Sequence, residues 1–338
     1  MKRKGKGPGT RAAPARPERS LTTLSLEPTG QDAAEFRHET VLRDEVVAAV
    51  AEAPAGWAVD CTLGGGGHAE AILAQCPQLS LLGLDRDPAA LAAASARLAP
   101  FGARFAPVQA PFAELAQVCA ARGLTELSAI VADLGVSSHQ LDTAERGFSF
   151  RFEGPLDMRM DPTQGPTLAE LLETVTLEDL ADVLYNYGDI RHSIGTARIV
   201  LQAYREGAAT TGELARHLAR RLPRERSMHP ATQVFQALRI WVNGELAQLE
   251  TLLHDGPQLL AKGGVMAVIS FHSGEDRLVK QAFTALAPRK YGEFLRPQRK
   301  GMVPEDKEQE GNPRSRSARL RVLERAGARE EESGGDRE

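Results

Sequence analysis

Apolar runs and helical patterns alternate along the first third of the chain. Short apolar runs bounded by turn residues predict buried strands that end at residue 59 and cover residues 81–85, 105–108 and 129–133. Apolar residues at helical spacing predict helices over residues 41–53, from residue 69, and over 88–98 and 112–121. The run at 129–133 is almost wholly apolar, as expected for a strand covered on both faces. This alternation predicts a parallel α/β sheet with right-handed crossovers.

The rhythm changes after residue 140. Turn signals between residues 147 and 166 are followed only by helical patterns, over residues 168–172, 177–185, 194–204 and 211–222. A long helix is predicted over residues 230–260, capped by Gly263 and Gly264. Strands are then predicted over residues 265–271 and, at or near an edge, over residues 318–323. We therefore expect a sheet domain in two parts, residues 35–142 and 230–325, interrupted by a helical domain over residues 143–229.

Composition and charge exclude several classes of protein. The chain is 42% hydrophobic and 25% charged, which is ordinary for a soluble globular protein. A basic segment, residues 1–34, and an acidic one, residues 326–338, have the composition of disordered tails. With a net charge of −4, contact with nucleic acid would need local basic patches. Three scattered cysteines indicate reduced thiols in the cytoplasm, no metal site is expected, and no apolar run predicts a membrane span.

A glycine-rich turn is the strongest local signal for a ligand. The segment from Asp60 to His68 reads DCTLGGGGH, and it joins a strand to a helix. Glycines let the backbone turn sharply and admit a ligand, while Asp85, at the end of the next strand, suits the hydroxyls of a ribose. Nicotinamide-dependent oxidoreductases and S-adenosylmethionine methyltransferases share this layout, and a turn with nothing bound is the structural alternative.

Further blocks of sequence resemble one family. The segment DLGVSS, from Asp133 to Ser138, continues to Gln140 and Asp142, and it places a carboxylate and two hydroxyls at the carboxyl edge of the sheet. Together with the following blocks, this segment resembles the bacterial small-subunit ribosomal RNA methyltransferase H family, also called MraW, over about residues 36–324. The blocks are ERGFSF (145–150), GPLDMRMD (154–161), HPAT (229–232), FQALRIWVN (235–243), FHS (271–273) with EDR (275–277), and NPRSRS (312–317).

The resemblance implies a Rossmann-like class I methyltransferase fold with an inserted all-helical domain. It implies S-adenosylmethionine as cofactor, the small ribosomal subunit as partner, and methylation of the exocyclic N4 of a cytidine in the decoding region of 16S ribosomal RNA. It leaves the oligomeric state open. Two departures from the family pattern are Gly274, where leucine is usual, and the segment Gly195-Thr-Ala-Arg198. The cofactor contacts that the resemblance implies fall on Gly66, Gly67, His68, Asp85, Phe112, Asp133 and Gln140.

The chemistry of the amino group suggests which side chains act in catalysis. Because the lone pair of the cytosine amino nitrogen is conjugated with the ring, the enzyme mainly has to align this nitrogen with the sulfonium methyl group. Candidates for accepting the amino hydrogens are Asp133, Ser137 and His272, although a structural role is favoured for His272. The Asp/Asn-Pro-Pro-aromatic run of many amino methyltransferases is absent from the sequence.

The RNA contacts are expected from polar residues and arginine clusters outside the cofactor site. Asp157 and Asn243 are candidates for contacting the nucleotide, and structural roles, such as capping or bonding loop backbone, are the alternative for both. Arg220 and Arg221 lie in one basic cluster, which extends over residues 216–226, and a second cluster covers residues 296–321. Two other functions stay open from the residues alone: a non-catalytic RNA-binding or ribosome assembly factor, and an NAD-dependent oxidoreductase.

Overall fold

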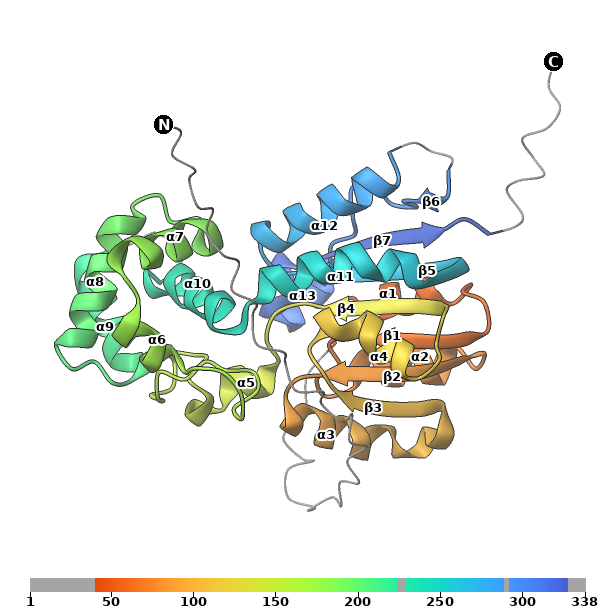
Figure 1. The fold of residues 1–338 in the computed structure, drawn as a ribbon, viewed down its shortest axis with the longest axis horizontal. Coiled ribbons are helices and arrows are strands. Elements are labelled where there is room, and N and C mark those ends of the chain that lie inside the picture. Colours follow the sequence, from red (N-terminus) through yellow and green to blue (C-terminus); the bar gives the residue numbers. More distant parts are fainter. Residues whose placement is uncertain (1–39, 224–228, 289–291, 328–338) are drawn as a thin grey trace, which may run out of the picture.

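The computed structural model describes residues 40–223, 229–288 and 292–327 (Figure 1). The basic tail predicted over residues 1–34 lies outside these ranges. So do residues 328–338 of the predicted acidic tail, and Arg224 and Arg226 of the first arginine cluster.

Seven strands in the described residues form one sheet, in the order β3-β2-β1-β4-β5-β7-β6. The first five strands of this order are parallel to one another, whereas β7 runs antiparallel to both β5 and β6. The predicted Rossmann-like sheet is confirmed, and the last predicted strand, now β7, lies one strand from the edge. The strands are β1 (Gly56–Asp60), β2 (Leu79–Asp85), β3 (Phe105–Gln109), β4 (Leu127–Asp133), β5 (Leu260–Ser270), β6 (Phe294–Leu295) and β7 (Arg319–Arg325).

Helices cover both faces of the sheet and form a separate unit beside it (Figure 1). The α-helices are α1 (Arg43–Val50), α2 (Gly67–Gln75), α3 (Pro88–Leu98), α4 (Leu115–Ala121), α5 (Ser138–Asp142), α6 (Leu168–Thr174), α7 (Leu177–Gly188), α8 (Ser193–Arg205), α9 (Thr211–Arg221), α10 (Ala231–Asn243), α11 (Glu245–Leu259), α12 (Ser273–Leu286) and α13 (Asp306–Gly311). The 3₁₀ turns within the described residues are η2 (Ala99–Arg104), η3 (Phe112–Glu114), η4 (Ala144–Arg146) and η5 (Pro313–Ser317).

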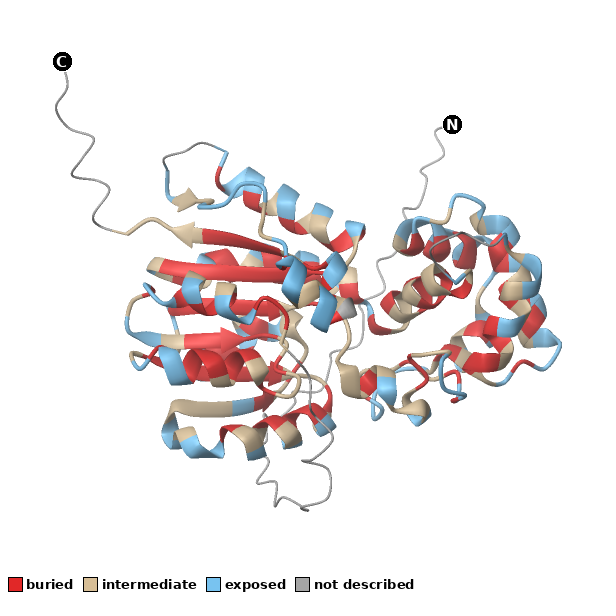
Figure 2. Ribbon diagram, turned by 180° about the vertical axis from the view of Figure 1, so that it is seen from behind, coloured by how far each residue is buried: buried red, intermediate tan, exposed pale blue. Residues whose placement is uncertain are grey.

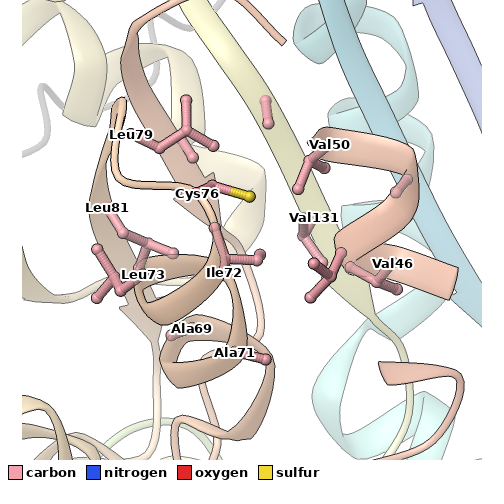
Figure 3. Packing of buried hydrophobic residues seen from close by; sticks show 14 of the residues in the cluster. Val46, Val50, Ala69, Ala71, Ile72, Leu73, Cys76, Leu79, Leu81 and Val131 are labelled. Atoms are coloured by element: carbon pink, nitrogen blue, oxygen red, sulfur yellow. The ribbon is translucent and has the colours of Figure 1, made fainter. Parts of the chain in front are cut away.

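Two apolar layers hold the helices on the sheet. On one face, Val46 of α1 and Ile72 of α2 pack with Leu81 and Val131 of the strands (Figure 3). On the other face, α4, α11 and α12 contribute to a second layer, which includes Phe283. The central strands are accordingly buried along most of their length (Figure 2). This double covering explains why β4 lacks alternating polar residues.

The inserted helices have a hydrophobic core of their own. Side chains from α6 to α10 form one cluster, to which Leu156 and Met158 of the preceding loop also belong. The described chain between residues 140 and 223 contributes no strand to the sheet, and its only strand-like pairing is an isolated bridge between Pro155 and Thr210. Because α10 packs in this cluster, the helical unit continues past residue 229, where the sequence placed its end.

The prediction of one long helix over residues 230–260 is wrong. The helix breaks at Gly244, whose φ of 61° is left-handed, so that α10 ends at Asn243 and α11 begins at Glu245. Glycine takes this conformation without the strain that a Cβ would cause. Gly263 and Gly264 do not cap a helix either, because α11 ends at Leu259 and both glycines lie within β5.

Asn243 joins the helical unit to the loop that precedes it. Its Oδ1 accepts a hydrogen bond from the Met160 amide at 2.8 Å, and its Nδ2 donates to the carbonyls of Met158 at 2.7 Å and Arg239 at 2.9 Å. Met158 is fully buried and has a left-handed φ of 62°, which is unfavourable for a residue with a side chain. The buried amide of Asn243 thus holds a strained segment in place.

We expect Asn243→Ala to lower the free energy of unfolding by about 3 kcal/mol, because the Met160 amide and the carbonyls of Met158 and Arg239 would lose the hydrogen bonds that the side chain makes to them. Urea denaturation followed by circular dichroism measures the change. Gln236→Ala removes a half-buried amide from the same helix and should cost less than about 0.5 kcal/mol. Equal losses in the two variants would show that the Asn243 amide does not hold the loop.

Candidate active site

A cavity of about 500 Å³ opens at the carboxyl ends of the parallel strands. Its wall is formed by the segments that follow β1, β2, β3, β4 and β5, and by residues of α11. The chain order reverses between β1 and β4, and open α/β sheets bind their ligands at such a switch point. The position therefore agrees with the edge at which the sequence placed a ligand.

Some glycines of the turn line the cavity, and others leave room for neighbouring side chains of the protein. Gly64 and Gly66 have left-handed φ values of 50° and 80°, and Gly64 lies on the cavity wall. A Cβ on Gly67 would lie 2.0 Å from Oγ1 of Thr40. Glycine at this position therefore leaves room for the Thr40 side chain. The residues that line the cavity include Gly67 but not Gly66, whose Cα faces Leu98 of α3. Gly66 is thus the one predicted cofactor contact that the structure places off the cavity wall.

Asp85 connects the end of β2 to the glycine turn. Its Oδ2 accepts a hydrogen bond from the Gly64 amide at 2.8 Å, and its Oδ1 accepts one from the Asp87 amide at 2.9 Å. Burial raises the pKa of Asp85 to about 6, although these two amides favour the charged form. The side chain also lines the cavity, and a carboxylate is an acceptor that suits ligand hydroxyls.

His68 and Asp133 bring polar atoms without hydrogen bonds to the cavity. His68 Nε2 lies 3.5 Å from Asp133 Oδ2, and neither ring nitrogen of His68 has a hydrogen-bond partner among the described residues. Oδ1 of Asp133 is buried and also lacks a partner there. Below them Asp60 is buried, which raises its pKa to about 6. Buried polar atoms without protein partners are unusual, and they are expected where a polar ligand binds.

The segment after β4 is ordered by its own side chains. Ser137 caps α5 by accepting a hydrogen bond from the Gln140 amide, and Gln140 Oε1 accepts one from the Ser137 amide at 3.0 Å. Gln140 Nε2 donates to Asp87 at 2.9 Å. Arg314 of η5 closes this side of the cavity through hydrogen bonds to Ser138 and Asp142. Gln140 therefore lies on the cavity wall with its amide engaged in positioning the loop.

His272 caps the first turn of α12. Its Nδ1 accepts hydrogen bonds from the amides of Gly274 at 3.2 Å and Glu275 at 3.4 Å, and its Nε2 lies 3.1 Å from Oε1 of Glu275. Phe271 and Glu275 line the cavity, whereas His272 is not among the lining residues. A Cβ on Gly274 would lie 3.1 Å from the imidazole, so glycine instead of leucine makes room for this cap.

Four of the candidate RNA contacts, Asp157, Arg220, Arg221 and Asn243, do not line the cavity, whereas Arg314 of the second arginine cluster does. The carboxylate of Asp157 pairs with Arg159 at 2.7 and 2.8 Å, and the Asn243 amide is engaged as described above. Arg220 and Arg221 are exposed at the end of α9. Arg321, in the second arginine cluster, is buried against Asp276, so its predicted contact with phosphate is wrong.

The sequence analysis missed the part of the wall formed near the break between α10 and α11. Arg239, Glu245 and Gln248 line the cavity there, and Arg86 joins them from the end of β2. Arg239 binds Glu245 through two hydrogen bonds of 2.8 Å. The only signal in the sequence was the glycine at position 244, in the middle of an otherwise helical pattern.

Two other possible kinds of site find no support in the described parts of the chain. Within residues 40–223, 229–288 and 292–327, no three side chains of His, Cys, Asp or Glu are grouped so that they could hold a metal ion. No helix in these ranges is both long and apolar enough to cross a bilayer.

Comparison with known proteins gives a consistent set of relatives. Residues 35–326 match the model of a family described as the MraW methylase family. A protein from Sorangium cellulosum named ribosomal RNA small subunit methyltransferase H is 48% identical over 297 residues, which cover 87% of this chain and 92% of the relative. A protein of the same name from Synechococcus elongatus is 45% identical over 293 residues, covering 86% of this chain and 95% of the relative.

Proposed function

The chain belongs to the MraW methylase family, and from this premise we propose that it methylates the exocyclic N4 of a cytidine in the decoding region of 16S ribosomal RNA, with S-adenosylmethionine as methyl donor. The observation that carries the proposal is 48% identity, over almost the whole relative, to a protein named as a methyltransferase of small-subunit ribosomal RNA. The cavity at the switch point of the sheet gives this activity a site.

The residues of the cavity fit S-adenosylmethionine. Asp85 offers carboxylate oxygens to the ribose hydroxyls, and Phe112 offers an apolar face near the end of β3. The polar atoms of His68 and Asp133 that lack partners suit the amino-acid end of the cofactor, which carries an ammonium and a carboxylate. These groups would hold the ribose and the amino-acid end of the cofactor.

The residues of this chain would mainly align the amino nitrogen and remove its proton. The cofactor, when bound, supplies an electrophilic methyl group. Asp133 lies at the end of β4, its amide donates to Thr62 Oγ1 at 2.6 Å, and its carboxylate reaches the cavity. Accepting a hydrogen bond from the cytosine amino group would orient the nitrogen lone pair toward the methyl group. The same carboxylate would then accept the proton that nitrogen releases.

The target base must leave its stack to enter a cavity at a sheet edge. Such unstacking costs least in irregular, single-stranded RNA, which fits a decoding-region substrate. Exposed arginines such as Arg220 would contact phosphates at a distance from the reacting atoms, while Arg314 stands at the cavity itself. The helical unit and the η5 turn would together hold the RNA across the opening.

Methyl transfer to isolated small ribosomal subunits tests the proposal. The full chain is incubated with labelled S-adenosylmethionine and subunits from cells that lack this methylation, and the modified nucleoside is identified and mapped by mass spectrometry. We expect N4-methylcytidine at one decoding-region position. No transfer would favour a non-catalytic assembly factor, and methylation of another atom or another region would replace the proposed substrate. Naked 16S RNA, used in parallel, shows whether the assembled particle is required.

A further inference from the structure

Gln248 carries an amide oxygen that the protein leaves without a partner. Its Nε2 donates to the Asn243 carbonyl at 2.7 Å, which fixes the orientation of the amide, since only the nitrogen can donate. Its Oε1 is buried and has no hydrogen-bond partner among the described residues. Gln248 also lines the cavity. A buried acceptor in this position is available to a donor on the ligand.

The break at Gly244 fixes this part of the wall. The Asn243 carbonyl, at the end of α10, accepts hydrogen bonds from both Gln248 Nε2 and Arg86 Nη1, the latter at 2.9 Å. Arg86 directly follows Asp85, so a single carbonyl holds Gln248 beside the end of β2. An uninterrupted helix would have used this carbonyl for its own backbone.

One part of the wall near Gln248 is apolar, as a purine ring requires, although charged residues such as Arg86 and Arg239 line the cavity as well. The cavity wall here includes Pro111 and Phe112, which follow β3, and Leu249 of α11. Phe112 and Leu249 belong to the same apolar layer. The neighbouring strand end carries Asp85, which suits the ribose, and a base attached to that ribose would extend into this apolar part of the cavity.

We propose that Oε1 of Gln248 accepts a hydrogen bond from the exocyclic 6-amino group of the cofactor adenine, and that it thereby selects adenine over a 6-oxopurine. This inference rests on the proposed cofactor site. A 6-oxo group would place a second acceptor against the amide oxygen, and the buried oxygen would stay without a donor. Sites that hydrogen-bond a ligand group reject analogues lacking that group more strongly than apolar pockets do.

Calorimetric titration with two ligands tests the assignment. S-adenosylhomocysteine and its 6-oxo analogue S-inosylhomocysteine are each titrated into the wild-type chain, Gln248→Leu and Gln258→Leu. The wild type should bind the adenine ligand at least about tenfold more tightly than the inosine ligand. Gln248→Leu should bind S-adenosylhomocysteine about tenfold more weakly than the wild type and discriminate less than about threefold. Gln258→Leu, the same change at an exposed site of α11, should behave as wild type.

The ratio of the two affinities is taken within each variant. A general loss of stability would weaken the binding of both ligands and would leave this ratio unchanged. Equal binding of the two ligands by the wild type would overturn the assignment, as would unchanged discrimination in Gln248→Leu. Either result leaves the proposed cofactor site standing. Failure of the wild-type chain to bind S-adenosylhomocysteine would overturn the cofactor site and this inference together.

Discussion

Replacement of Asp85 by alanine should weaken the binding of S-adenosylhomocysteine by about a hundredfold, as measured by calorimetry at pH 7.5. Two effects add. The ribose hydroxyls lose a charged acceptor, and the amides of Gly64 and Asp87 lose the oxygens that now hold the glycine turn in shape. An unchanged dissociation constant would remove Asp85 from the cofactor site.

The raised pKa of Asp85 allows a second test of its role in cofactor binding, through the pH dependence of the affinity. Burial raises this pKa to about 6, so the carboxylate is ionised at pH 7.5 and becomes protonated as the pH falls below 6. If the ionised form accepts the ribose hydroxyls, wild-type affinity should fall between pH 7 and pH 5. In the Asp85→Asn variant the side chain at this position does not ionise, so this part of the pH dependence should be absent. Asp60, whose pKa is also about 6, is present in both proteins and contributes to both pH profiles.

Asp133→Ala should lower the rate of methyl transfer by about a thousandfold, because the amino group would lose both its orienting acceptor and its proton acceptor. The backbone contact to Thr62 survives, since it uses the Asp133 amide. Single-turnover rates with small subunits measure the loss, and calorimetry with S-adenosylhomocysteine measures cofactor affinity, which should change less than about tenfold. Asp133→Asn keeps one acceptor oxygen and should retain more activity than the alanine variant.

The opposite pattern would contradict this role for Asp133. If the dissociation constant rises about a hundredfold while the rate at saturating cofactor is unchanged, the carboxylate serves only to bind the amino-acid end of the cofactor. The proton acceptor would then have to come from the rest of the loop after β4, where Ser137 is the remaining candidate on the cavity wall.

The sequence predicted the parts of the fold that follow from local patterns. Parallel strands covered on both faces produce apolar runs that are easy to locate, and each run ends where the sheet presents its carboxyl edge. Asp85 and Asp133 could therefore be placed at the site from their positions alone. The glycine run marked a turn, but it did not reveal which glycine faces the cavity and which one packs against α3.

The features that the sequence did not reveal depend on contacts between distant residues. Apolar periodicity continues across Gly244, so the pattern does not distinguish a helix break from a tolerated glycine, and Gln248 was missed with it. In the sequence Arg321 resembles the other arginines of its cluster, and only the structure shows that it binds Asp276 of α12. Histidine is an uncommon N-cap, so the sequence did not predict that His272 caps α12. The hydrogen bonds that its side chain accepts in the structure show this role.

A crystal structure of the full chain soaked with S-adenosylhomocysteine and cytidine would show directly whether the cavity binds the cofactor and presents the base to Asp133. We expect adenine beside Phe112 and Gln248, ribose hydroxyls on Asp85, and the cytidine amino group beside Asp133. That nitrogen should lie within about 3–3.5 Å of the position a sulfonium methyl would occupy. Density for S-adenosylhomocysteine outside this cavity, or a cytidine amino group pointing away from Asp133, would contradict the account.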